Sequence, residues 1–152
     1  MFEFEISTDI NATAQDIWDL IDDTSRYPEW VDPTDRMLAT AEGGLKLGAT
    51  YREYGGIPPF KGESDWVVTE YEPLTRQVHV GEDGAIKMTL VVELTPSQSG
   101  TRFTQSLKLT PRWWLRVPMT ILWLLLMSRR GKAAIRQTHA NAKVILEASK
   151  DA

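Results

Sequence analysis

The strongest constraint on the fold is a change along the chain from a strand-like to a helical spacing of apolar residues. Between residues 34 and 110, glycine- and proline-rich turns separate runs of strand-like length, which is typical of successive antiparallel hairpins. Beyond Pro111 the apolar spacing becomes helical, and Ile135, Thr138 and Ala142 share one face of a long helix. A sheet and a helix that are each apolar on one face bury those faces against each other. We therefore predict an α+β fold, with a curved antiparallel sheet of six to seven strands around a long C-terminal helix.

Two short helices are expected between the first strand and the hairpins. Residues 2–7 alternate apolar with polar side chains, which predicts a strand with one buried face. Thr13 and Asp16 are spaced as in a capping box, so a helix is expected to begin there. Residues 27–30 predict a second short helical turn. The clearest later strands are 61–71, 76–80, 85–95 and 101–110.

Length, cysteine content and charge limit the kinds of site and partner that the chain can have. The 152 residues suit a single domain, 1–152, and the absence of cysteine excludes disulfides, thiolate metal sites and thiol catalysis. The net charge of −4 conceals an asymmetry. Residues 1–95 contain 7 Lys+Arg and 19 Asp+Glu, whereas residues 96–152 contain 10 and 2. The basic part therefore has the charge to meet an anionic partner, or to face the acidic part within the fold.

Several stretches together resemble one known superfamily. They are the helix start at 13–23, the Tyr-Pro-Glu-Trp turn at 27–30, the strand end at 68–73 and the closing helix around 141–147. The chain resembles the START/Bet v 1-like (SRPBCC) superfamily, in particular its polyketide cyclase/dehydrase-like branch. The resemblance implies a helix-grip fold. That superfamily includes aromatase/cyclases, ligand carriers and lipid-transfer domains, so it leaves the function open.

A curved sheet gripped by one helix can leave space for an apolar ligand. The leading hypothesis is therefore binding or transport of a hydrophobic small molecule or lipid in a cavity between the sheet and the C-terminal helix. Gln105 is a polar exception on an otherwise apolar strand face, and it needs a partner or water if buried. The residues expected to line the cavity are Trp66, Met88, Leu90, Phe103, Gln105, Leu107, Trp123 and His139.

A cyclase/dehydratase-like enzyme acting on a polyketide-like substrate is the alternative. Tyr51 could donate a hydrogen bond to a substrate carbonyl, with Glu53 and His139 as groups that transfer a proton. Packing between strands would equally explain Tyr51 and Glu53. His79 lies between Val78 and Val80 and is expected to point away from the core if those valines point inward. Two histidines without cysteine make a poor metal site, and neither a metal nor a cofactor is expected.

Residues 113–127 form the most apolar stretch of the chain. Arg116 and Pro118 interrupt it, and its unbroken part is about half of the roughly 20 residues that cross a bilayer. Every side chain from 121 to 127 is apolar, and one helix cannot bury its whole circumference against one sheet. Arginine and lysine flank the stretch at both ends, up to Lys132.

The stretch has several possible roles. It could be a lid over the cavity, a homodimer interface, a ligand contact, or a peripheral contact with an anionic membrane. A nucleic-acid partner is not expected, because the neighbouring sequence is aliphatic and the first 95 residues are strongly acidic. The first residues lack the basic start and apolar run of a secretory signal. We therefore expect a cytoplasmic location, with peripheral membrane contact left open.

Overall fold

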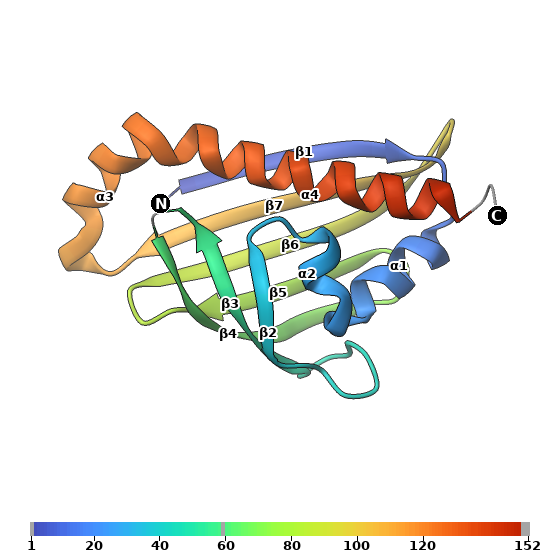
Figure 1. The fold of residues 1–152 in the computed structure, drawn as a ribbon, viewed down its shortest axis with the longest axis horizontal. Coiled ribbons are helices and arrows are strands. Elements are labelled where there is room, and N and C mark those ends of the chain that lie inside the picture. The colour runs from blue at the N-terminus through green and yellow to red at the C-terminus, as the bar shows by residue number, and fades with distance from the viewer. Residues whose placement is uncertain (1, 59, 150–152) are drawn as a thin grey trace.

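Seven strands form one antiparallel sheet in the computed structural model, which describes residues 2–58 and 60–149 (Figure 1). Their spatial order is β1-β7-β6-β5-β4-β3-β2. The predicted succession of hairpins accounts for the order from β2 to β7, and β1 is added beside β7. The strands are β1 (Phe2–Ile10), β2 (Thr34–Ala39), β3 (Thr50–Ile57), β4 (Phe60–Glu72), β5 (Arg76–Glu82), β6 (Ile86–Ser97) and β7 (Gly100–Pro111).

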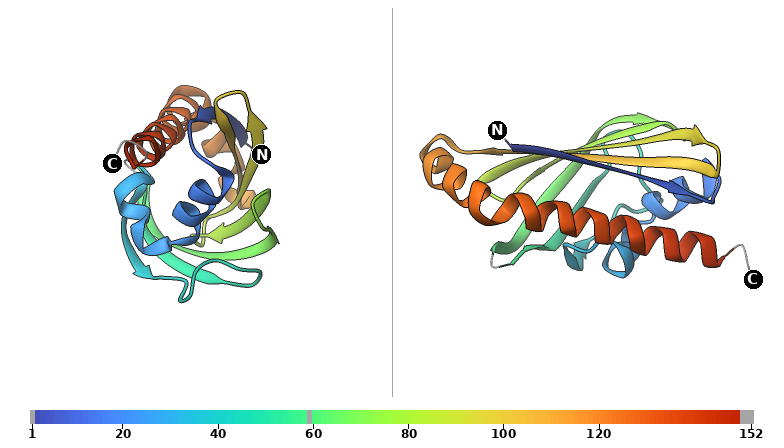
Figure 2. Two further views of the ribbon diagram at one scale, coloured as in Figure 1. Left: turned by 90° about the vertical axis from the view of Figure 1, so that its right-hand side faces the viewer. Right: turned by 90° about the horizontal axis from the view of Figure 1, so that it is seen from above.

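The helices lie in two groups. Between β1 and β2 are α1 (Ala14–Asp22), the 3-10 turn η1 (Thr24–Arg26) and α2 (Tyr27–Trp30). After β7 come the 3-10 turn η2 (Trp113–Leu115), α3 (Arg116–Leu122), the π-helical turn η3 (Trp123–Met127) and the long α4 (Ser128–Ala148). The sheet curves around α1, and α4 with α2 closes the ring (Figure 2). The predicted α+β helix-grip arrangement is confirmed.

Local sequence explains how the helices begin and pack. The Thr13 hydroxyl accepts a hydrogen bond from the backbone N–H of Asp16 at 3.1 Å, which confirms the predicted helix start. In α4, the buried residues Ile135, Thr138 and Ala142 confirm the predicted inner face. Gly131 lets this helix approach β1, because a Cβ at this position would lie 2.8 Å from Cζ of Phe4.

The register fixes which side chains face inward. Across the sheet, Tyr51 pairs with Trp66, Val68 with His79, and Leu90 with Leu107. Between Val68 and Glu70 the register shifts, so that Thr69 forms a β-bulge. Past the bulge, Tyr71 faces inward and Glu70 faces outward.

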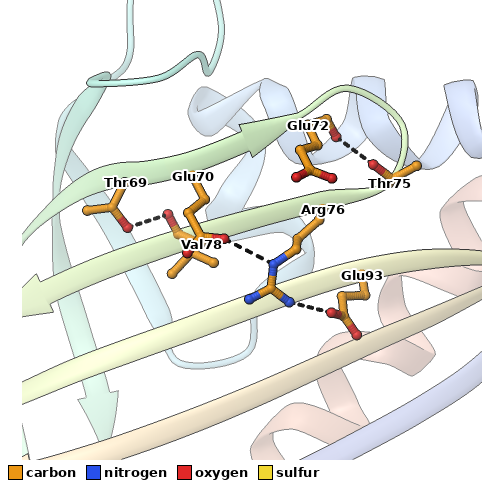
Figure 3. A network of polar contacts seen from close by, with 7 residues as sticks. All are labelled: Thr69, Glu70, Glu72, Thr75, Arg76, Val78 and Glu93. Atoms are coloured by element: carbon orange, nitrogen blue, oxygen red, sulfur yellow. Dashed lines mark hydrogen bonds and ion pairs between the residues drawn. The ribbon is translucent and has the colours of Figure 1, made fainter.

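The outer face of the sheet is charged beyond this bulge (Figure 3). The Arg76 guanidinium lies between two carboxylates, donating from Nε to Glu70 at 3.1 Å and from Nη1 to Glu93. The Thr69 hydroxyl donates to the backbone oxygen of Val78 at 3.4 Å. This network belongs to the solvated side of the sheet, because Glu70 is exposed and both Arg76 and Glu93 are partly so.

The expectation that His79 points away from the core is wrong. Only 1% of His79 is exposed, and its partner in the register is the inward-facing Val68. Val78 instead pairs with Glu70 on the outer face. The prediction assumed that the valines of this strand mark its inner side. The inner row of β5 is polar because its side chains hydrogen-bond to other buried polar groups.

Candidate functional site

The inner face of the sheet carries most of the side chains expected to line a cavity, and their burial differs along it. Phe103 and Gln105 on β7 are buried, and so is Trp66 on β4. Met88 and Leu90 on β6 are only half-buried. Their neighbours Ile86 and Leu107 are also half-buried, and Ile86 pairs with Pro111, just before η2. Solvent therefore reaches the inner face at the end of the sheet that adjoins α3.

Trp123 lies apart from that group, over the first strand. Its ring stacks on Phe2 with ring centroids 4.8 Å apart and on Phe4 at 5.5 Å. Phe4 in turn lies beneath Gly131. The aromatic stack anchors the π-helical turn η3 to the edge strand β1.

His139 on α4 belongs to a small polar cluster inside the fold. The Oγ1 of Thr8 lies 2.8 Å from Nδ1 of His139, and Oε1 of Gln105 lies 3.1 Å from Nε2. Since an amide oxygen only accepts, Nε2 carries the proton and Nδ1 accepts from the Thr8 hydroxyl. Phe103 stacks on the imidazole at 4.4 Å. Burial lowers the pKa of His139 to about 4, which agrees with a neutral ring.

The cluster ends at the Gln105 amide nitrogen, which donates no hydrogen bond within the described part of the chain. Gln105 Oε1 accepts from His139, whereas Nε2 has no hydrogen-bond partner among the residues that the structure describes. This nitrogen is not among the fully buried polar atoms that lack a partner. It therefore keeps a small accessible area beside the half-buried Leu107.

A second and longer polar network crosses the inner face near α1. Nδ1 of His79 lies 2.8 Å from the Tyr51 hydroxyl, and Nε2 lies 2.8 Å from Oε1 of Gln77. The Gln77 amide nitrogen donates to Asp22 at 3.2 Å, and the Tyr71 hydroxyl donates to the same carboxylate at 2.8 Å. Gln77 thus turns its oxygen to the ring, so His79 donates from Nε2 and accepts from Tyr51.

Burial sets the protonation states of this network. It lowers the pKa of His79 to about 4 and raises the pKa of Tyr51 well above its ordinary value. Burial also raises the pKa of Asp22, although the hydrogen bonds from Tyr71 and Gln77 oppose that change. The network is therefore a chain of neutral groups that ends on a carboxylate at the surface.

Glu53 faces inward next to this network. Its two carboxylate oxygens accept hydrogen bonds from the Trp66 indole at 2.9 Å and from the Thr34 hydroxyl at 2.6 Å. Burial raises the pKa of Glu53, and the two hydrogen bonds partly oppose the rise. Tyr51 stacks on Trp66 at 6.0 Å. The structure thus brings Tyr51, Glu53 and Trp66 together, while His139 makes its contacts in the other cluster.

Sequence reasoning missed His79 and Gln77. A buried tyrosine requires a hydrogen-bond partner for its hydroxyl, and this requirement was the available signal. It does not say where the partner is, because Tyr51 and His79 are 28 residues apart.

Two grooves open on the described surface, and neither contains a residue that was predicted to line the cavity. The larger, of about 640 Å³, lies between α4 and the β3–β4 turn and is lined by Asp32, Gly56, Ile57, Pro58, Lys61, Arg130, Ala133, Ala134 and Gln137. The smaller, of about 400 Å³, lies beside α1 and is lined by Asp19, Asp22, Asp23, Thr24, Ser25, Thr40, Ala41, Glu42, Gly43 and Gly44. Among the residues described, no group of three or more His, Cys, Asp or Glu side chains is arranged to hold a metal ion.

The family profile described as polyketide cyclase / dehydrase and lipid transport matches residues 1–140, and the chain belongs to this family. The superfamily resemblance seen in the sequence is therefore confirmed. No curated protein matches the sequence.

Solved structures share the fold at low identity. The di-domain ARO/CYC StfQ from the steffimycin biosynthetic pathway is 14% identical with a TM-score of 0.77, covering 99% of this chain and 52% of StfQ. Protein CV1439 from Chromobacterium violaceum is 14% identical with a TM-score of 0.67, covering 97% and 99%. The Polyketide_cyc-like protein Cgl2372 from Corynebacterium glutamicum is 24% identical with a TM-score of 0.61, covering 97% and 92%. Within the described residues, no helix has the length and apolarity needed to cross a membrane.

Proposed function

We propose that this protein binds or transports a hydrophobic small molecule or lipid between the inner face of the sheet and the C-terminal helix. The family description, which includes lipid transport, supports this proposal. The observation that carries it is the row of half-buried aliphatic side chains on β6 and β7, formed by Ile86, Met88, Leu90 and Leu107. These side chains face inward and yet remain accessible to water. Covering such surface is favourable by about 25 cal/mol per Å², so an apolar ligand would gain by completing the core here.

Gln105 indicates one further property of the ligand. Its unpaired Nε2 donor lies on the same inner face as Leu107. A ligand that covers this donor excludes water from it and must replace the lost hydrogen bond, so the ligand we propose is mainly apolar and carries one acceptor oxygen, such as a carbonyl or hydroxyl group.

Ligand capture and a space-filling variant test this proposal. Native mass spectrometry of the purified protein should detect a bound hydrophobe, and the fluorescent probe 1-anilinonaphthalene-8-sulfonate should be displaced by long-chain ketones or alcohols. Leu90→Phe should fill the half-buried space and weaken probe binding. Val144→Phe, at a position that is 69% exposed on the outside of α4, is the matched control. Equal binding by Leu90→Phe and the wild type, or no bindable hydrophobe at all, would contradict the proposal.

A cyclase/dehydratase activity on a polyketide-like substrate is the second candidate. The inward position of Tyr51 and Glu53 favours it, because a carboxyl group with a raised pKa can exchange a proton at a substrate carbonyl. Binding is favoured over turnover because the two Glu53 oxygens and the Tyr51 hydroxyl are already engaged with the protein. Incubation with a poly-β-keto thioester, followed by mass spectrometry, tests the activity. Product formation that survives in both Glu53→Gln and Tyr51→Phe would exclude these residues as catalytic groups.

A further inference from the structure

Residues 113–127, called the apolar arm below, present a large apolar surface to solvent. They comprise η2, α3 and η3, and no residue of η2 or α3 is buried. Trp113 is 79% exposed, Val117 73% and Leu125 71%. Trp114, Ile121 and Leu126 are also exposed. Large apolar side chains exposed together on one short segment are typical of a site of interaction in a folded protein.

The arm is held away from the body by ordered contacts. Figures 1 and 2 show α3 at the end of the molecule opposite to the C-terminus and α1, extending beyond the sheet and turning away from the line of α4. The backbone N–H of Arg112 donates to the oxygen of Ala85 at 3.0 Å, which fixes the start of the arm. The stacking of Trp123 on Phe2 and Phe4 fixes the start of η3 within the arm. The exposure of the arm is therefore part of the folded structure.

Three exposed aliphatic side chains of the arm recur at regular spacing. Val117, Ile121 and Leu125 follow one another at four-residue spacing, which places them along one side of the helical stretch. Trp113 and Trp114 lie at the beginning of the arm. Tryptophan is favoured at the interface between lipid and water, where its ring contacts acyl chains and its N–H meets polar groups.

Positive charge flanks the arm without compensation. Arg112 precedes the arm, Arg116 lies near its beginning, and Arg129 and Arg130 follow it after one serine, all four exposed. Between residues 94 and 146 the sequence contains no aspartate or glutamate. None of these four guanidinium groups has a carboxylate partner among the residues described, although Arg130 donates to the backbone oxygen of Pro58 at 2.8 Å. By contrast, Arg52, Arg76 and Arg102 elsewhere are each paired with a carboxylate.

This charge pattern decides between the surfaces that could cover the arm. A second copy packed arm to arm would bring the arginines of two chains together, which is unfavourable. The surface of an anionic bilayer complements both properties, since acyl chains accept the apolar side and lipid phosphates attract the arginines. We propose that the apolar arm docks on an anionic membrane surface, with Trp113 and Trp114 at the depth of the lipid headgroups. The strongly acidic first 95 residues would be repelled, which orients the arm toward the lipid.

The docking does not depend on the ligand binding proposed above, and its test uses the full chain without added ligand. Co-sedimentation with vesicles of phosphatidylcholine alone, and of phosphatidylcholine with phosphatidylglycerol, measures binding. We expect binding to the anionic vesicles that falls as salt is raised. Trp113→Ser/Trp114→Ser should reduce it roughly tenfold or more, and Arg112→Gln/Arg116→Gln should have a similar effect.

Matched variants control for solubility and folding. Leu47→Ser/Val144→Ser removes two apolar side chains that are 66% and 69% exposed and lie outside the arm, and Arg136→Gln removes an exposed charge further along α4. Both controls should bind like the wild type, and circular dichroism should show that every variant is folded. Equal binding by the tryptophan variant, or no binding to anionic vesicles by the wild type, would overturn the proposal. So would a dimer in sedimentation velocity that the tryptophan substitutions abolish while vesicle binding is absent.

Discussion

The two ends of this molecule differ in which side chains they bury and which they expose. At the end that carries α1, Tyr51, Gln77 and His79 lie buried in a hydrogen-bonded network that ends on Asp22. At the end that carries α3, apolar side chains of the arm lie in water, and Ile86 at the start of β6 is only half-buried. Among its described residues, the α1 end hydrogen-bonds its buried polar groups with the exception of the Trp30 indole N–H, whereas the α3 end leaves apolar groups exposed at the surface.

This difference separates stability from function along a single sheet. The α1 end contributes cooperative packing and hydrogen bonding, which specify a unique core. The α3 end has apolar surfaces that become stabilising only when another molecule covers them, as is common at binding sites. Substitutions at the α1 end should therefore change stability most, whereas substitutions in the arm should change interactions with little effect on stability.

The largest effect is expected at Phe103. This residue is completely buried and stacks on His139, so Phe103→Ala removes a large apolar volume from the core. A loss of about 3–5 kcal/mol in the free energy of unfolding is expected, measured by urea titration with circular dichroism. Val117→Ala in the arm should change stability by less than about 0.5 kcal/mol. Equal losses in the two variants would remove the distinction between the two ends.

Acidification should weaken the buried network next. His79 and His139 each have a folded-state pKa of about 4, below the ordinary value of 6.5. Between these values the unfolded chain binds more protons than the folded one, so stability is complete above pH 6.5 and falls as the pH falls toward 4. From pH 7 to 5 each histidine should account for a loss of about 2 kcal/mol.

Asp22 and Glu53 respond in the opposite sense. Their raised pKa values mean that the folded state takes up protons first, so they add stability as the pH falls through those raised values. Urea titrations at several pH values measure the sum. The slope between pH 7 and 5 should be shallower in His139→Gln than in the wild type, and an unchanged slope would show that His139 does not titrate as described.

The contact between α4 and β1 is expected to have an intermediate effect. Gly131→Ala places a Cβ 2.8 Å from Cζ of Phe4, and such overpacking costs about 1–3 kcal/mol. Alanine regains about 1 kcal/mol as a better helix former, so a net loss of about 1 kcal/mol is expected in thermal unfolding. Lys132→Ala, at the exposed neighbouring position, should be neutral. A stabilised Gly131→Ala variant would show that the helix has room to move away from Phe4.

The smallest effect is expected on the charged outer face drawn in Figure 3. Arg76 is partly exposed, and ion pairs in water contribute little because solvent screens them. Arg76→Gln should cost about 0.5 kcal/mol at low salt and less at high salt, as urea titration would show. If Arg76→Gln lowered the free energy of unfolding as much as Phe103→Ala, the ion pairs of the outer face would contribute to stability as strongly as the core does.

Sequence periodicity predicted elements whose burial pattern is local. The first strand, the helix start at Thr13 and the inner face of α4 follow from side chains within a few residues of one another. The exposure of the arm was also foreseeable, because an apolar stretch without a polar face cannot be buried by one sheet. The orientation of His79 was not foreseeable, since its partner Tyr51 comes from a strand two positions away in the sheet. Polar networks depend on such distant pairs, and alternation cannot reveal them.

The bulge at Thr69 bears on how this sheet tolerates changes of length. Two residues of β4 oppose a single residue of β5 there, and Val68 and Tyr71 still both face inward. A strand without Thr69 would keep every later side chain on the same side, so the sheet can lose this residue without exchanging its two faces. The loss of one residue at Trp66 or Val92 would turn the rest of the strand inside out and exchange its buried row for its charged one.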